Sequence, residues 1–273
     1  MAGHSVSVII SSFNQPNALR LALAGFAAQD HRDFELIVAD DGSDPDTAEI
    51  VKQFARRAPL EVEFITQEHR GGRKPYILNL GTVNSRGQQL IFTDGDCVPF
   101  RDFVSTHVAH YRPHGFCTGG NTHFALEESR ALTPEDIVNG LHEKSLTPGK
   151  RRQLYWVHLK NRAYQLLGKK DEPKIVGRNF SVDRGAFLDV NGFDETYNGF
   201  RKSDSEIRNR LRNAGYTGTS LWDCAFVCHV DHKLDPRQYA DSRQRPSASP
   251  ELYRGSLRRI RALRGIDLLL PQR

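Results

Sequence analysis

The chain has 273 residues, and its 38 lysines and arginines exceed its 33 aspartates and glutamates by five. The surplus lies at one end. Residues 236–273 hold nine arginines, no lysine and three acids, so this tail carries +6 and residues 1–235 carry −1. A nearly neutral body argues against a nucleic-acid-binding protein. The content of 38% hydrophobic and 26% charged residues is that of an ordinary soluble globular protein.

Neither a membrane span nor an exported protein is predicted. No apolar run approaches the roughly 20 residues that a membrane-spanning helix needs. The start, Met1–His4, lacks a charged segment, and the apolar run Val6–Ile10 is too short for a signal peptide. None of the four cysteines forms a CxxC pair. We therefore expect reduced thiols and a cytoplasmic location.

Strand and helix patterns alternate over the first half of the chain. Short apolar runs predict strands at Val6–Ile10, Phe34–Ala39, Val62–Thr66 and Gln89–Thr93. Apolar residues at helical spacing predict helices at Ala18–Ala28, Thr47–Arg57 and Tyr76–Val83. Apolar strands separated by helices are typical of a parallel sheet covered on both faces. We therefore expect an α/β fold with a mostly parallel, Rossmann-like sheet.

The second half has a less regular pattern. It predicts strands at Gly115–Phe124, Ile175–Val182 and Ala225–Val230, and helices at Lys150–Leu167 and Ser203–Ala214. The helix Lys150–Leu167 is basic and aromatic. Its aromatic side chains either line an acceptor site or pack on the core, and the second interpretation is favoured.

Unusual polar residues follow three of the predicted strands. They are the segments Ser11–Asn14, Asp40–Asp41 and Asp94–Asp96. Ligands of open α/β sheets bind beyond the carboxyl ends of the strands. Since parallel strands end at the same edge, we expect these three segments to converge although they are far apart in the sequence.

The segment Asp94-Gly95-Asp96 is the first candidate site. Two carboxylates that flank a glycine can hold a divalent cation, and Gly95 lets the backbone approach a ligand. Such a cation can bridge the phosphates of a nucleotide-sugar. The alternative is a plain turn, because Asp-Gly is a common turn dipeptide.

Two further segments suit the rest of a nucleotide. Asp40 and Asp41 can accept hydrogen bonds from a pyrimidine N3–H and a ribose hydroxyl. The alternative is that Asp41–Asp44 caps the next helix, and both can hold at once, with one acid capping and the other binding. The run Arg70–Lys74 precedes a helix, where N–H groups and cations suit a diphosphate. The alternative is a solvated basic turn.

The segment Ser203–Glu206 is typical of a capping box, with Ser203 as N-cap and Glu206 three residues on, and the residues alone favour this interpretation. The functional alternative is a general base at Asp204, which the helix N-terminus would keep ionised. In the pair Arg178-Asn179 a polar couple interrupts an apolar strand, which is typical of a cleft wall, and Asn179 could hold the transferred sugar or the acceptor.

Cysteines and histidines gather near residue 228. A zinc site is disfavoured because Cys224 and Cys228 would share one face of a strand while His229 points to the other. One imidazole, from His229 or His232, completing the coordination of a cation at Asp96 is the better interpretation.

The chain resembles the inverting family 2 glycosyltransferases of the GT-A fold, over about residues 5–235. The resemblance is carried, in order, by Val8–Asn14, Ile37–Ser43, Arg73–Asn79, Phe92–Pro99, Asn191–Glu195, Gly199-Phe200, the Asp204 helix and His229. It is strongest to bacterial enzymes that build capsule, lipopolysaccharide or chondroitin-like chains. The second half looks like the C-terminal part of galactosyltransferases.

The resemblance implies a UDP-sugar as donor, Mn²⁺ or Mg²⁺ as cofactor and Asp204 as catalytic base. The implied metal ligands are Asp94, Asp96, His229 and His232. The implied donor-binding residues are Ser11, Phe13, Asn14, Asp40, Asp41, Arg70, Arg73, Lys74, Asn79, Asp94, Gly95 and Asn179. The implied organisation is a nucleotide-sugar half at 1–120, an acceptor and catalytic half at 121–235 and a basic tail at 236–273.

One motif departs from the family pattern Gly-Trp-Gly-x-Glu-Asp. The chain keeps Asp204 but has Ser203 for the glutamate and Arg201 for the second glycine. The expected reaction is transfer to a hydroxyl of a glycan or lipid-linked acceptor in cell-surface polysaccharide synthesis, and Arg201 with Lys202 would favour an acidic or phosphorylated acceptor. The alternatives are a sugar-phosphate nucleotidyltransferase and a non-catalytic sugar-binding relative.

The tail carries none of these motifs. Its pattern from Glu251 to Leu270 predicts one helix with leucines on one side and arginines on another. Such a helix can dock on the body. Alternatively, residues 246–273 attach reversibly to an anionic membrane, which would place the protein on the inner face of the cytoplasmic membrane.

Overall fold

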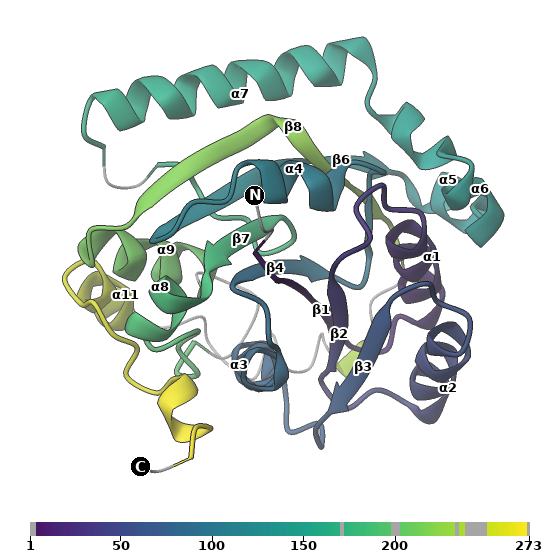
Figure 1. The fold of residues 1–273 in the computed structure, drawn as a ribbon, viewed down its shortest axis with the longest axis horizontal. Coiled ribbons are helices and arrows are strands. Elements are labelled where there is room, and N and C mark those ends of the chain that lie inside the picture. The colour runs from purple at the N-terminus through teal and green to yellow at the C-terminus, as the bar shows by residue number, and fades with distance from the viewer. Residues whose placement is uncertain (1–3, 170–171, 198–202, 233–234, 238–249, 272–273) are drawn as a thin grey trace.

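A computed structural model describes residues 4–169, 172–197, 203–232, 235–237 and 250–271 (Figure 1). The strands are β1 Val6–Ser12, β2 Glu35–Asp40, β3 Glu61–Thr66, β4 Gln89–Asp94, β5 Cys97–Pro99, β6 Gly115–Phe124, β7 Phe180–Asp183 and β8 Thr217–Val230. The α-helices are α1 Pro16–Ala27, α2 Pro45–Ala55, α3 Lys74–Asn84, α4 Phe103–Ala109, α5 Leu126–Ala131, α6 Pro134–Val138, α7 Pro148–Leu166, α8 Arg184–Asp189, α9 Ser203–Asn213 and α11 Pro250–Ser256. Short 3₁₀ turns lie at Leu141–Ser145 and Ile266–Leu268.

The strands form one mostly parallel sheet in the order β3-β2-β1-β4-β7-β6-β8-β5. Neighbours β3, β2, β1 and β4 run parallel, as do β6 and β8, whereas β7 is antiparallel to both β4 and β6. The α/β class and the parallel sheet expected from the sequence are therefore confirmed. The sequence pattern did not predict β5 or the short helices α4, α5, α6 and α8.

Helices cover both faces of the sheet, because successive strand residues point to opposite sides. On one face Ile9, Ile37 and Phe92 pack against residues of α3, α8 and α9. On the other face Val8 and Val38 pack against residues of α1, α2 and α4. These two apolar layers hold the strands in register.

Two predicted strands differ from the observed ones. The chain at Ile175–Val182 becomes a strand only at Phe180, because a turn closes first with the Asn179 N–H donating to the Val176 carbonyl at 2.9 Å. β8 begins earlier than Ala225, and its pairing with β6 shifts between Gly119 and Gly120. This irregularity bends the long strand.

The tail docks on the body but is not one helix. After α11, the N–H groups of Ala262 and Ile266 donate to the carbonyls of Val190 and Asn191 at 3.0 and 3.1 Å. Those N–H groups would be bonded within the segment if a helix continued to Leu270, so the prediction of a single helix is wrong. Ile266 is buried in the core beneath α3 and α9, which agrees with the docking interpretation.

Two of the three aromatic residues of α7, Tyr155 and Trp156, do not pack on the core, contrary to the favoured interpretation, and the third, Tyr164, is partly buried. Within α7 the buried residues are Leu154 and Asn161, whereas Tyr155 and Trp156 are exposed. Figure 1 shows α7 as an outer layer lying along β8. In the described ranges, no helix combines the length and the apolar character needed to cross a bilayer.

A buried ion pair holds α9. Glu206 does not cap the helix from Ser203 as a capping box would require; its two carboxylate oxygens accept bonds of 2.6 Å from Arg210. Arg210 is fully buried and also donates to the carbonyl of Val190. The same carbonyl accepts the bond from Ala262 of the tail. Burial raises the pKa of Glu206 against the opposing effect of Arg210.

We expect the variant Arg210→Met to lower the free energy of unfolding by about 3–5 kcal/mol, because it leaves Glu206 buried without its partner. Urea denaturation followed by circular dichroism measures this change. The double variant Glu206→Leu/Arg210→Met should recover most of the loss, since both buried charges are then gone. A single variant as stable as the parent would contradict this account.

Candidate active site

A cleft of about 350 Å³ opens at the carboxyl ends of β1, β2 and β4. The register places Ser12 opposite Asp40 and Ser11 opposite Asp94, so the three polar segments converge as predicted. The predicted site residues that line the cleft are Ser11, Phe13, Asp41, Lys74, Asp94, Asp96 and Asp204. Gln15, His69, Gly177, Arg178 and Ser203 also line it.

One end of the cleft has an aromatic surface beside a carboxylate. The rings of Phe13 and His69 stack with their centroids 4.2 Å apart and 17° between their planes. Asp41 accepts a hydrogen bond from the Arg73 N–H at 3.0 Å and another from Gln67. Burial raises the pKa of Asp41 despite these bonds. A flat base and a hydrogen-bond donor suit this end of the cleft.

Asp40 has a different task from Asp41. Its carboxylate accepts bonds from the N–H groups of Gly42 and Ser43 at 3.1 and 2.8 Å, and from the Thr66 hydroxyl at 3.0 Å. Asp40 is buried and outside the cleft lining. It therefore shapes the turn that presents Asp41. Asp40 does not cap α2, whose N-cap residue is Asp44.

Lys74, the first residue of α3, interacts with two acids of the cleft, Asp94 and Asp204. Its ammonium forms an ion pair with Asp94, whose carboxylate also accepts a 2.8 Å bond from the Ser11 hydroxyl. Burial would lower the pKa of Lys74, but Asp94 and Asp204 outweigh that effect and raise it. The ammonium is thus held charged between the two acids.

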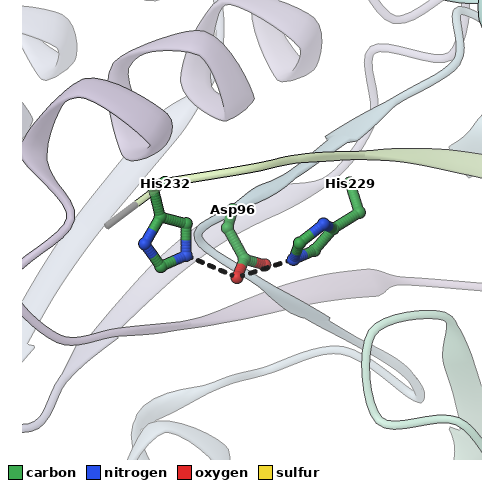
Figure 2. A group of neighbouring side chains, drawn as sticks. All are labelled: Asp96, His229 and His232. Carbon is green, nitrogen blue, oxygen red and sulfur yellow. Dashed lines mark hydrogen bonds and ion pairs between the residues drawn. The ribbon is translucent and has the colours of Figure 1, made fainter. Parts of the chain in front are cut away.

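A carboxylate and two imidazoles meet beside the cleft. Oδ2 of Asp96 lies 3.3 Å from Nε2 of His229 and 3.1 Å from Nε2 of His232, and Figure 2 shows the two rings on either side of the carboxylate. His229 comes from β8, and His232 follows it. Burial would raise the pKa of Asp96, but the two histidines outweigh it and hold the pKa well below its usual range.

This donor set fits a divalent metal ion. The three ligand atoms of Asp96, His229 and His232 lie within 4.8 Å of one another, and Asp94 with Asp96 and Cys97 forms an overlapping group. Two imidazole nitrogens and a carboxylate oxygen suit first-row transition metals such as Mn²⁺ better than Mg²⁺, which prefers oxygen ligands. Both histidines that the sequence indicated therefore point to the same atom of Asp96.

Asp204 faces the cleft from the first turn of α9. Its Oδ2 accepts a 2.9 Å bond from the Gly177 N–H, and its other oxygen lies 3.5 Å from the Ser203 hydroxyl. Burial raises the pKa of Asp204, against the lowering effects of Lys74 and Gly177. The direction is opposite to the one the helix N-terminus alone would produce, and a raised pKa brings a carboxylate closer to the range of a general base.

Two predicted donor-binding residues lie in the core instead of the cleft, which corrects those predictions. Asn79 is fully buried and bonds both the N–H and the carbonyl of Phe193 at 2.8 Å. Asn179 is fully buried and donates to the carbonyls of Gly120 and Ala225. Their side-chain amides form hydrogen bonds within the protein, so these two residues stabilise the backbone behind the cleft.

The remaining predicted residues lie at the margin of the cleft. Asn14 bonds Asp235 and the Asp44 N–H, and Arg70 pairs with Glu68 at the surface. The side chain of Arg73 stacks on Tyr76. The Gly95 N–H donates to the Ser11 carbonyl at 2.8 Å. The predicted acceptor segment at 199–202, with Arg201 and Lys202, lies outside the described residues.

His69 and Gly177 were not predicted from the sequence. His69 follows the carboxyl end of β3, so the rule that selected the ends of β1, β2 and β4 would have selected it too. No residue pattern indicated Gly177, because its role is a backbone N–H and its tight fit: a Cβ there would lie 2.8 Å from Oδ1 of Asp204.

Comparison with known proteins adds a family. The sequence model of glycosyl transferase family 2 matches residues 7–190, and a model described as the N-terminal domain of galactosyltransferase matches residues 157–233. Chondroitin synthase of Escherichia coli is 25% identical over 224 residues, which are 77% of this chain and 32% of that protein. Matches to three further curated relatives span 28%, 11% and 26% of their lengths.

Solved structures share the fold. The mannosyltransferase PcManGT from Pyrobaculum calidifontis, in complex with GDP-Man and Mn²⁺, aligns with a TM-score of 0.60 and 17% identity over 92% of this chain and 68% of that one. TarS 1–349 of S. aureus, in complex with UDP-GlcNAc, aligns with a TM-score of 0.59 and 16% identity over 92% and 64%.

We expect saturable Mn²⁺ binding by isothermal titration calorimetry, lost in Asp96→Asn and weakened at least ~10-fold in His232→Gln, because each change removes a ligand atom. Mg²⁺ should bind more weakly than Mn²⁺. His31→Gln, a histidine change at an exposed position, is the matched control. Equal Mn²⁺ affinity in Asp96→Asn and the parent would rule out this metal site.

Proposed function

The chain belongs to glycosyl transferase family 2, and on that premise we propose that it is an inverting, metal-assisted glycosyltransferase. It transfers a sugar from a UDP-sugar to a hydroxyl of a glycan or lipid-linked acceptor in cell-surface polysaccharide synthesis, on the cytoplasmic side of the membrane. The observation that carries the proposal is the placement of Asp204 in the same cleft as Asp41 and the Asp94–Asp96 pair.

The donor lies along the cleft from Phe13 to Asp96. The uracil ring stacks at the Phe13 and His69 surface, and Asp41 accepts the hydrogen bond of its N3–H. The UDP-GlcNAc complex of TarS, which shares the fold, supports a uridine nucleotide. PcManGT is in complex with GDP-Man, so GDP-sugars are the alternative donors to test against UDP-sugars.

The diphosphate lies beside Asp96, His229 and His232. A manganese or magnesium ion held by these residues would neutralise charge on the departing diphosphate. The charged Lys74 ammonium lies at the same place and adds a second positive group. Two imidazoles in the ligand set favour manganese.

Asp204 acts on the acceptor. Its carboxylate takes the proton from the acceptor hydroxyl as that oxygen attacks the anomeric carbon from the side opposite the diphosphate. The new bond joins oxygen to carbon, the bond from that carbon to UDP breaks with its electron pair on UDP, and the proton stays on Asp204. One displacement inverts the configuration. The Gly177 N–H holds the carboxylate in place at 2.9 Å.

The acceptor side of the cleft differs from the family pattern. Ser203 lines the cleft where relatives of this type carry a glutamate before the base. A smaller neutral side chain leaves Asp204 as the acid that α9 contributes to the cleft lining. The altered residues 201–203 support an acidic or phosphorylated acceptor. The same departure from the family pattern also motivates the alternative function, that of a non-catalytic sugar-binding relative.

The proposal is tested by release of free nucleotide from a panel of UDP-sugars and GDP-sugars with Mn²⁺. A transferase hydrolyses its own donor slowly even without acceptor. The nucleotide-sugar from which nucleotide is released therefore identifies both the transferred sugar and the nucleobase of the donor. A non-catalytic relative would bind a donor without releasing nucleotide. A nucleotidyltransferase would consume a nucleoside triphosphate and a sugar phosphate instead.

We expect Asp204→Asn to lower the turnover of donor and acceptor by roughly 10²–10⁴-fold, because the amide cannot take the proton. UDP affinity, measured by calorimetry, should stay near the parental value. Asp46→Asn is the matched control, since Asp46 lies exposed in the first turn of α2 as Asp204 lies in that of α9. A turnover of Asp204→Asn equal to that of the parent would contradict the assignment of Asp204 as the catalytic base.

The activity should also depend on pH through Asp204. The base works when deprotonated, so turnover is lost as the pH falls through its pKa, which burial raises above 3.8. Lys74 lowers that pKa, so Lys74→Met should move the midpoint of the acid limb to higher pH, while Lys74→Arg leaves it nearer the parental value. The measurement is turnover against pH at saturating donor. An acid limb unmoved in Lys74→Met would contradict the coupling.

A further inference from the structure

The outer side of α7 exposes several large apolar side chains to solvent. Trp156 is 63% exposed, Leu166 89% and Leu167, which follows the helix, 74%, and Tyr155 is exposed as well. Such a group of large apolar side chains is unusual on the surface of a monomer and marks an interaction site. The inner side of α7 lies along β8, where Leu154 and Asn161 are buried.

These apolar residues share one side of the helix. At 100° per residue, Trp156, Ala163 and Leu167 lie within about 40° of one another, and Leu166 and Tyr155 lie about 80–100° to one side of Trp156. Arg152 and Lys160 lie about 40° to either side of Trp156, and Arg162 lies just beyond Tyr155. The exposed side of the helix therefore carries large apolar side chains with cations among and beside them.

The charge of this segment has one sign. Residues 148–169 contain six lysines and arginines and no aspartate or glutamate. Arg151, Arg152, Lys160, Arg162 and Lys169 are exposed. In the part of the chain that the structure describes, no carboxylate lies within ion-pair distance of these five side chains. Their charge is available to a negatively charged partner.

The tail is a weaker candidate for the same role. Its exposed side chains, including Leu257 and Leu263, lie on a segment that is helical only at Pro250–Ser256 and Ile266–Leu268. Between these, the backbone bonds to the body. One of its arginines, Arg261, already lies 3.7 Å from Asp267. The tail therefore lacks the continuous helix on which α7 presents its apolar side chains.

We propose that α7 binds the surface of an anionic lipid bilayer, with the helix axis parallel to the membrane. Trp156 and Tyr155 lie at the level of the headgroups, Leu166 and Leu167 enter the upper acyl region, and the flanking cations contact anionic headgroups. The five exposed cations that have no ion-pair partner among the described residues favour this partner over an uncharged surface. The proposal concerns α7 alone, so its failure leaves the proposed transfer reaction standing.

Co-sedimentation with vesicles tests the proposal. The parent should bind vesicles of phosphatidylcholine with 30% phosphatidylglycerol far better than phosphatidylcholine alone. Arg152→Gln/Lys160→Gln/Arg162→Gln should weaken this binding on the order of a hundredfold, since each surface cation contributes about fivefold, or about 1 kcal/mol. Trp156→Ala/Leu166→Gln/Leu167→Gln should weaken it comparably. Nucleotide release in solution should be unchanged in both variants.

A second measurement reports where the helix lies. In a Trp222→Phe background Trp156 is the single tryptophan, and its fluorescence should shift to shorter wavelength and be quenched by brominated lipids when vesicles are added. The matched control is Leu257→Gln/Leu263→Gln, which removes exposed leucines beside arginines in the tail and should bind like the parent.

Three results would overturn the proposal. The first is parental vesicle binding in both α7 variants. The second is loss of binding in the tail control instead of the α7 variants. The third is a parent protein that does not bind vesicles but forms a dimer, or binds an acidic protein, through α7. Circular dichroism of each variant shows that a loss of binding does not come from unfolding.

Discussion

The parallel register of β1 with its two neighbours determines the geometry of the cleft. Because Ser12 lies opposite Asp40 and Ser11 opposite Asp94, the segments that leave these strands start at one edge. A shift of one residue would turn every side chain to the other face. The two apolar layers prevent that shift, since alternate strand residues are buried under different helices. Packing far from the cleft thus decides which polar groups meet in it.

Charge balance is the second constraint. Four acids line one cleft: Asp41, Asp94, Asp96 and Asp204. They are compensated by different groups, which are backbone N–H groups for Asp41 and Asp204, Lys74 for Asp94 and two histidines for Asp96. The consequence is that their pKa values move in opposite directions, down for Asp96 and up for Asp41 and Asp204. One cleft can therefore offer both a cation site and a proton acceptor.

The positive charge of the chain has two locations. The body is nearly neutral although it contains a basic helix, α7, because acids elsewhere in the body, including those of the cleft, offset the six cations of residues 148–169. The arginine-rich tail is partly used in docking, with Arg261 donating to the Asp189 carbonyl and Ile266 buried in the core. A membrane contact through α7 and a tail that supports α9 would give the two basic regions separate tasks.

The sequence by itself determined the alternation of strands and helices, the acids at the strand ends and the position of Asp204 at the start of a helix, because the apolar period and the succession of elements along the chain are local properties. Tertiary structure alone decided which member of each polar pair faces the cleft. Asp41 and Arg178 do, whereas their neighbours Asp40 and Asn179 bond inside the protein. It also turned Trp156 outward. These choices depend on partners far away in the sequence, such as Thr66 for Asp40 and Gly120 for Asn179, and neighbouring residues in extended chain point in opposite directions.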